Sequence, residues 1–184
     1  MSRPFGLTAL LLLLALTAAG CDDGGGDRTS RTSAADTSGG ASSAPSFQKE
    51  GTLAFVRGQD TLSTLDLEIA ETQKARQRGL MQRLALPEGS GMIFLFDQEQ
   101  PRGFWMKNTP MALDIFFADA DSQIVRVAKN TTPYSTERIE SGQPAQFVVE
   151  VPAGYADRRG ILAGDHIRFK RSGGGNAPFG ATAN

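Results

Sequence analysis

The stretch GMIFLFDQEQPRGFWMKNTPMALDIFF, residues Gly91–Phe117, decides the fold. Gly91–Phe96 is a continuous apolar run, which is typical of a strand buried on both faces. The polar residues Asp97–Arg102 predict a turn, and Gly103–Lys107 predicts the next strand. Leu113–Phe117 then alternates in the manner of a further strand. The stretch therefore predicts three strands in succession along the chain, and it contains the only tryptophan of the chain.

Outward from this stretch, the pattern predicts more short strands and two short helices. Further strands are expected at 53–57, 64–69, 124–128, 146–151 and 166–170, helices at 72–78 and 153–159, and a long loop at 130–144. Sheets of this kind hide their edges by closing into a barrel or stacking as a sandwich. The predicted fold class is mainly β, or β-rich α+β: a compact barrel-like or sandwich domain of about seven short strands with two short helices.

The N-terminal residues have the order of a secretory signal peptide. Arg3 provides the positive charge, Leu7–Ala19 is the apolar segment, and Ala18-Ala19-Gly20 supplies small residues at a cleavage site. Cys21 follows directly and is the only cysteine, an arrangement that resembles the bacterial lipobox. The sequence predicts cleavage after residue 20 and a lipid on Cys21; the alternative is ordinary secretion with a free thiol.

Four segments follow from this interpretation. Residues 1–20 form the signal peptide, and residues 21–49 form a lipidated, disordered tether rich in Gly, Ser and Thr. Residues 50–171 form the β-rich domain, and residues 172–184 form a flexible tail. The protein is expected in the cell envelope, held to a membrane through the lipid on Cys21, on the periplasmic or outer surface.

Composition excludes several classes. The net charge is −1 and the Lys and Arg residues show no excess, so nucleic acid is not expected as a partner. One cysteine and one histidine exclude a disulfide framework and a structural zinc site of the Cys/His type within one chain. No metal and no cofactor are predicted.

Three clusters of residues resemble a known family. They are Arg78–Arg83, then the segments Gly91–Phe94, Phe104–Thr109 and Leu113–Phe116, and finally Val149–Gly154 with Gly164-Asp165. In this order they are similar to the prokaryotic family called domain of unknown function number 192, over about Leu65 to Phe169. Ala112 departs from the family pattern, which has proline there. The resemblance implies a compact, barrel-like β fold and implies no established activity.

A polar cluster at the end of the central strand is the candidate site. Alternation places Trp105 and Lys107 on one face of that strand, and aromatic plates with a few polar groups are typical of small-ligand pockets. The candidate ligand-binding residues are Arg78, Arg83, Trp105, Lys107, Asn108, Thr109, Asp114 and Glu150. The alternative is that the same residues form a structural network without a ligand.

An enzyme is the alternative from another class. Asp114 and Glu150 are the two carboxylates that a hydrolase would pair for acid and base catalysis. No nucleophile elbow, phosphate loop or metalloprotease motif accompanies them, and His166 stands alone. Methionines including Met81 and Met106 raise a further alternative, a copper site. The function predicted first is therefore a non-enzymatic module that binds a small molecule, a glycan or an envelope partner.

Overall fold

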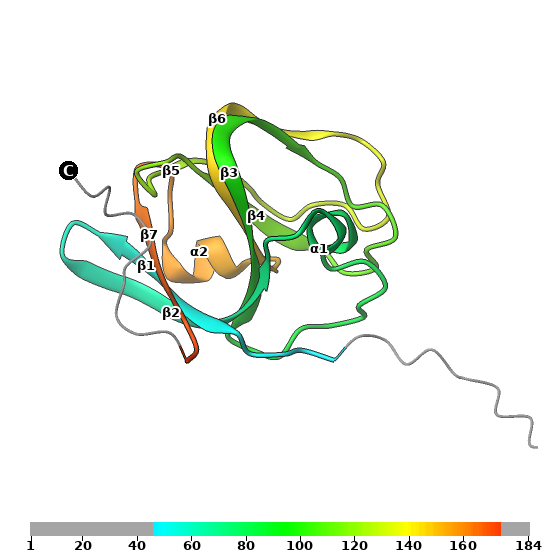
Figure 1. The fold of residues 1–184 in the computed structure, drawn as a ribbon, viewed down its shortest axis with the longest axis horizontal. Helices are drawn as coiled ribbons and strands as arrows, with labels where there is room; N and C mark the ends of the chain where they lie inside the picture. Colours follow the sequence, from blue (N-terminus) through cyan, green and yellow to red (C-terminus); the bar gives the residue numbers. More distant parts are fainter. Residues whose placement is uncertain (1–45, 174–184) are drawn as a thin grey trace, which may run out of the picture. The chain divides into compact units, whose positions relative to one another are not determined.

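The computed structural model describes residues 46–173, which form one sheet of seven strands and two short helices (Figure 1). The elements are β1 (Gly51–Arg57), β2 (Asp60–Ala70), α1 (Gln73–Arg78), β3 (Ser90–Phe104), β4 (Leu113–Ala118), β5 (Ile124–Ala128), β6 (Ile139–Pro152), α2 (Tyr155–Arg159) and β7 (His166–Arg171). The sheet curls into a half-barrel, and this confirms the predicted mainly β fold class. The predicted signal peptide, Cys21 and the tether as far as residue 45 lie outside the described residues.

The strand order is β5-β4-β6-β3-β2-β1-β7, and all neighbours are antiparallel except β2 and β3. The two ends of this order meet where the β4–β5 turn reaches the start of β7. There the amide of Ile124 donates to the carbonyl of Asp165 over 2.7 Å, and the amide of Ile167 donates to the carbonyl of Ser122 over 2.9 Å. These bonds pair backbone groups that a flat sheet would leave open at both edges. Neither helix within the described residues is long and apolar enough to cross a membrane.

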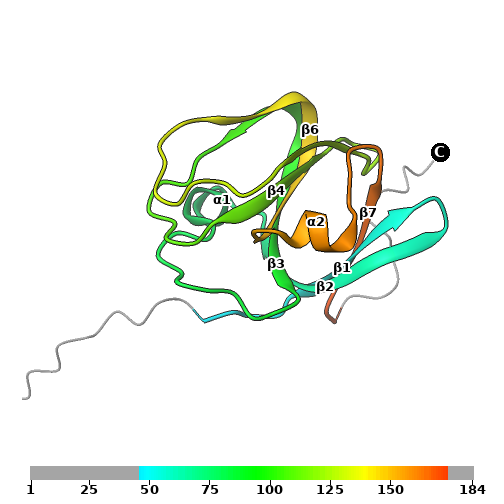
Figure 2. The same ribbon diagram turned by 180° about the vertical axis from the view of Figure 1, so that it is seen from behind.

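Alternation along the central strands divides the core between two faces. The inner face packs against α2 and includes Phe116 and Val149; Figures 1 and 2 both show α2 within the curve of the sheet. The outer face packs around α1 and includes Phe94, Ile115 and Val148. Every residue of β4 is buried, which agrees with a strand covered on both faces. The face on which a side chain lies therefore determines whether it packs near α2 or near α1.

The predicted boundaries around β3 and its partner β6 are wrong. Asp97–Arg102 is extended and belongs to β3, because this part of β3 pairs with the first half of β6. β6 starts at Ile139, which shortens the predicted loop at 130–144. The polar side chains there are largely exposed, so a two-stranded extension accommodates them without burial. β3 ends at Phe104, so the strand alternation predicted for residues 103–107 does not continue through Lys107.

Candidate functional site

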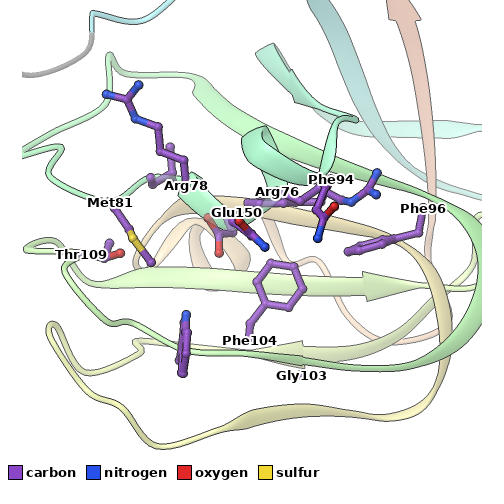
Figure 3. A pocket seen from close by; sticks show the side chains of 14 residues that line it. Arg76, Arg78, Met81, Phe94, Phe96, Gly103, Phe104, Thr109 and Glu150 are labelled. Atoms are coloured by element: carbon purple, nitrogen blue, oxygen red, sulfur yellow. The ribbon is translucent and has the colours of Figure 1, made fainter.

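A cavity of about 530 Å³ opens on the outer face, between α1 and the bend of β3 (Figure 3). One wall is aromatic and comes from β3 and the residue that follows it. The opposite wall comes from α1 and the turn after it. Glu150 on β6 lies at the base. The cavity thus joins segments that are far apart in the sequence but meet on one side of the sheet.

Local capping signals place α1 over the cavity. The hydroxyl of Thr72 accepts from the amide of Ala75 over 3.1 Å, as an N-cap does, and Gly79 ends the helix with φ of 46°. None of the residues of α1 is buried. Gln73 and Gln77, one turn apart, are exposed and line the cavity.

The aromatic wall is held by edge-to-face contacts. The ring of Phe104 lies 5.0 Å from that of Phe94 at 89° and 5.9 Å from that of Phe117 at 82°, between ring centroids. Such T-shaped pairs contribute about 0.5–1.5 kcal/mol each beyond area burial, so they favour this position of the Phe104 ring in the wall. Trp105 extends it to the surface and is 52% exposed, with the Nζ of Lys107 5.4 Å from its ring centroid.

Glu150 is the polar group at the base of the cavity. Its neighbours across the sheet are Met92 on β3 and Ile115 on β4, and only 5% of the residue is exposed. Within residues 46–173 its carboxyl group has no hydrogen-bond or ion-pair partner. Burial raises the pKa of Glu150 to about 8, because removal from water disfavours the charged form. At neutral pH the group is therefore mostly protonated and can donate a hydrogen bond.

The turn after α1 closes over this carboxyl group. A Cβ atom added at Gly79 would lie 3.9 Å from the Oε2 of Glu150 and only 3.1 Å from the ring of Phe94. Glycine is therefore needed twice at this position, for its positive φ and for the close approach to the aromatic wall.

Arg76 and Arg78 line the cavity, and Arg102 lies beside its aromatic wall, over the ring of Phe96. The guanidinium of Arg76 donates to the carbonyls of Leu95, over 2.8 Å, and Glu71. That of Arg102 lies 3.8 Å from the ring centroid of Phe96, and burial followed by the charge of Arg76 lowers the pKa of Arg102. Arg78 is exposed, and Figure 3 shows its guanidinium pointing away from Glu150. The mouth is consequently positive.

Four of the residues predicted from sequence line the cavity: Arg78, Trp105, Thr109 and Glu150. Lys107 lies at its edge, over Trp105. Asn108 has φ of 57°, and its carbonyl accepts from the amide of Gln82 over 2.7 Å, so it shapes a turn. Arg83 is buried with Glu68, and their Nη1 and Oε2 atoms are 2.7 Å apart. Asn108 and Arg83 therefore agree with the alternative of a structural network without a ligand.

Asp114 does not face the cavity. Its Oδ1 accepts from the amide of Asn130 and its Oδ2 from the amide of Ala156 at the start of α2, both over 2.9 Å. Asp114 pairs with Val151, and Glu150 with the next residue of β4, so the two carboxyl groups point to opposite faces of the sheet. They cannot act on one substrate, and the hypothesis of a hydrolase that uses this pair is wrong.

Sequence reasoning did not place the cavity walls. Phe94, Phe96 and Phe104 read as core, and Gln73 and Gln77 carried no signal beyond the capping residues of their helix. A second hollow of about 730 Å³ lies over β1 and β7 and includes His166. Its lining contains no buried carboxyl group without a partner, so the first cavity is the candidate site. Met106 lies in the core, where its sulfur accepts from the hydroxyl of Thr131 over 3.2 Å. His166 lines the second hollow instead.

Comparisons with known proteins agree with this fold. The profile of the family DUF192, described as an uncharacterized ACR, matches residues 54–169. A crystal structure of a candidate transcription regulator from Sinorhizobium meliloti 1021 is 32% identical, with a TM-score of 0.62, over 69% of this chain and 96% of that chain. One of a protein of unknown function from Novosphingobium aromaticivorans DSM 12444 is 32% identical, with a TM-score of 0.60, over 63% of this chain and 82% of that chain. No curated protein matches the chain. The chain belongs to the DUF192 family of uncharacterised proteins.

Proposed function

We propose that this domain is a non-enzymatic module that binds a small molecule in the cavity between α1 and β3. The observation that carries the proposal is Glu150, a carboxyl group without a partner at the base of an aromatic cavity. The residue is 5% exposed and lines the cavity, so its carboxyl oxygens are accessible from the cavity and are not occupied by the protein. A ligand that exchanges a hydrogen bond with Glu150 would satisfy a polar group that the fold leaves unpaired, which makes Glu150 the proposed anchor.

Size and composition support the same proposal. A cavity of about 530 Å³ lies within the range of about 300–1,000 Å³ that is common for small-molecule sites. Its walls are mostly apolar, and a few amide, guanidinium and carboxyl groups are placed among them. Rigid aromatic rings reduce the entropy lost on binding, because the wall needs no ordering when the ligand arrives.

The position of Asp114 favours binding over catalysis. Acid and base chemistry on one substrate needs two groups within reach of it. On the outer face, Glu150 is the only carboxyl group among the residues that line the cavity. The nearest residue of β4 that could serve as its partner is turned to the inner face, where backbone amides occupy both of its oxygens.

We also propose that the domain works at a membrane surface, anchored by a lipid on Cys21. The proposal is supported by the order of charged, apolar and small residues that ends at Cys21, the single cysteine of the sequence. Labelled palmitate incorporated by the wild type and lost in Cys21→Ser supports the anchor. Absence of label on the wild type, or label that survives the substitution, contradicts it.

The experiment for the binding site is a calorimetric screen of small molecules and oligosaccharides with three proteins. The wild type is compared with Gln77→Phe, which places a ring in the cavity from the exposed surface of α1. Lys74→Phe is the matched control, since Lys74 is exposed on the same helix and does not line the cavity. We expect hits to lose at least tenfold in affinity in Gln77→Phe and to keep it in Lys74→Phe. Hits that bind all three proteins equally would place the site elsewhere.

The name of the Sinorhizobium relative does not lead us to propose nucleic-acid binding as a second function for this chain. A protein that binds nucleic acid by its surface needs an excess of Lys and Arg to contact phosphates. Here the net charge is −1, with 19 Lys and Arg against 20 Asp and Glu.

A further inference from the structure

We infer that the ligand is a small organic anion with a flat apolar body, such as an aryl or arylalkyl carboxylate, bound with its acidic group toward the arginines and Glu150. This inference rests on the proposed function, and it names the chemistry of the ligand. Among the residues that line the cavity, two are cations, Arg76 and Arg78, and one is an acid, Glu150. Lys107 adds a further positive charge at the edge, over Trp105. Charge complementarity therefore favours an anion.

The two arginines differ in what they can offer. Arg76 is fixed by backbone carbonyls, and its guanidinium lies 5.1 Å from the ring centroid of Phe96, so its charge is held beside the aromatic wall. Arg78 is exposed, and its guanidinium has no hydrogen-bond or ion-pair partner within residues 46–173. Its long side chain is free to pair with an anion at the mouth, because no internal bond has to be broken.

The groups that face Glu150 explain why a cation fits less well. From α1, Arg76 and Arg78 line the same cavity; from β3 and β4, its cross-strand neighbours Met92 and Ile115 carry no charge. On β2, Glu68 lies in the same cross-strand row, and Arg83 pairs with it. Asp114 points to the other face. The two arginine charges lie toward the mouth, since Arg78 points away from Glu150 and Arg76 is held beside Phe96. A cation would therefore have to pass these charges before it reached an acid that is mostly protonated.

A protonated Glu150 suits an anion. Its hydroxyl donates a hydrogen bond to the oxygen of the bound carboxylate, and neither group changes its protonation state. Burial of Glu150 sets the direction of the pH effect, since its pKa is raised to about 8. As the pH rises through this value, Glu150 loses the donor and becomes an anion beside an anion, so affinity falls.

The experiment uses three probes with one body and three head groups: 3-phenylpropionate, 3-phenylpropanol and 3-phenylpropylammonium. Trp105 is the only tryptophan and lines the cavity, so its fluorescence in the full chain reports occupancy. We expect 3-phenylpropionate to bind at least tenfold more tightly than 3-phenylpropylammonium at neutral pH. We also expect its affinity to fall at least fivefold as the pH rises from 6.5 to 9.5.

Three variants sharpen the result. Glu150→Gln keeps a neutral donor at every pH, so it retains 3-phenylpropionate and loses the pH dependence. Arg78→Gln weakens the anion about threefold and leaves 3-phenylpropanol unchanged. Arg168→Gln is the matched control, because it removes the same charge from an exposed position on β7, outside the cavity, and changes neither probe.

The remaining outcomes overturn the inference. Tighter binding of 3-phenylpropylammonium, lost in Glu150→Gln, would assign a cation to the cavity and leave the proposed binding function standing. Equal binding of 3-phenylpropanol and 3-phenylpropionate would remove the role of charge. If no probe binds and the cavity-blocking Gln77→Phe screen also finds no ligand, the inference and the proposed function fail together.

Discussion

The inner and outer faces of the sheet are built from the same strands, but they differ in whether their buried acidic residue has hydrogen-bond partners. On the inner face, Asp114 of β4 is buried and both of its oxygens accept from backbone amides. On the outer face, Glu150 of β6 is buried nearly as deeply, and its carboxyl group has no partner within the described residues. The helices differ in the same way, since α2 buries Tyr155 and Ala156 whereas α1 buries none of its residues.

The difference separates structure from function. A buried carboxylate with two charge-assisted hydrogen bonds stabilises the fold and leaves no capacity for a ligand. A buried carboxyl group without a partner costs stability and keeps its full capacity to bind. Proteins tolerate such local costs where they are used, which is why the outer face is the place to look for function.

The largest expected effect is a loss of stability from removing the buried acid of the inner face. Asp114→Ala leaves the buried amide of Ala156 and the part-buried amide of Asn130 without an acceptor. A donor left without a partner costs about 1–3 kcal/mol, so we expect the loss of both bonds to lower the free energy of unfolding by about 2–5 kcal/mol in urea unfolding. Asp114→Asn keeps one acceptor oxygen and should lose about half as much. A change below 1 kcal/mol in Asp114→Ala would show that these bonds do not support the inner face.

The second prediction is that replacing the buried acid of the outer face raises stability, whereas replacing that of the inner face lowers it. A carboxyl group ionises near 4.5 when unfolded, whereas the pKa of Glu150 in the fold is about 8. Between these values the unfolded state binds fewer protons, so the free energy of unfolding falls as the pH rises, by at most about 1.4 kcal/mol per pH unit. Glu150→Gln removes this penalty, and we expect it to stabilise the protein by roughly 3 kcal/mol at neutral pH.

The pH profile provides the control for this second prediction. Wild type and Glu150→Gln should unfold at similar urea concentrations near pH 4.5 and separate as the pH rises to 8. A constant difference across this range would mean that amide packing, and not ionisation, causes the stabilisation.

The faces themselves could be predicted from the sequence. Alternation in Leu113–Phe117 separates Asp114 from Ile115, and alternation in the strand at 146–151 puts Glu150 opposite Val149 and Val151, as the structure has them. Pattern alone could not align the two strands. The pairing of Glu150 with Ile115 depends on register, and register decided that the two acids do not converge.

The cavity could not be predicted, for a different physical reason. The apolar residues of β3 give the same signal whether a ring packs against other side chains or lines a hollow, and Phe94 does both. The polar segment at 97–102 resembled a turn because exposed strands need no apolar residues. Trp105 was identified from its rarity, yet its half-exposed position follows from the end of β3 at Phe104, which alternation does not reveal.

The third prediction compares the caps of the two helices. α2 is capped from another strand, by Asp114, whereas α1 depends on the hydroxyl of its own Thr72. Replacing an N-cap threonine with alanine costs about 1 kcal/mol. We expect Thr72→Ala to lower stability by about this amount and to speed amide hydrogen exchange in α1 while leaving α2 unchanged. Faster exchange in both helices would mean that the two faces are coupled.

The smallest expected effect on stability belongs to Trp105, and it isolates function from fold. The side chain is 52% exposed, so Trp105→Ala should change the free energy of unfolding by no more than about 0.5 kcal/mol. Its ring forms the outer part of the aromatic wall, and losing an aromatic contact of about 1 kcal/mol should weaken 3-phenylpropionate about fivefold in calorimetry. Tyr134→Ala is the matched control, because it removes an exposed aromatic side chain that does not line the cavity. If both variants bind 3-phenylpropionate equally weakly, the loss of affinity comes from removing any exposed aromatic side chain. The aromatic wall of the cavity would then have no specific part in binding.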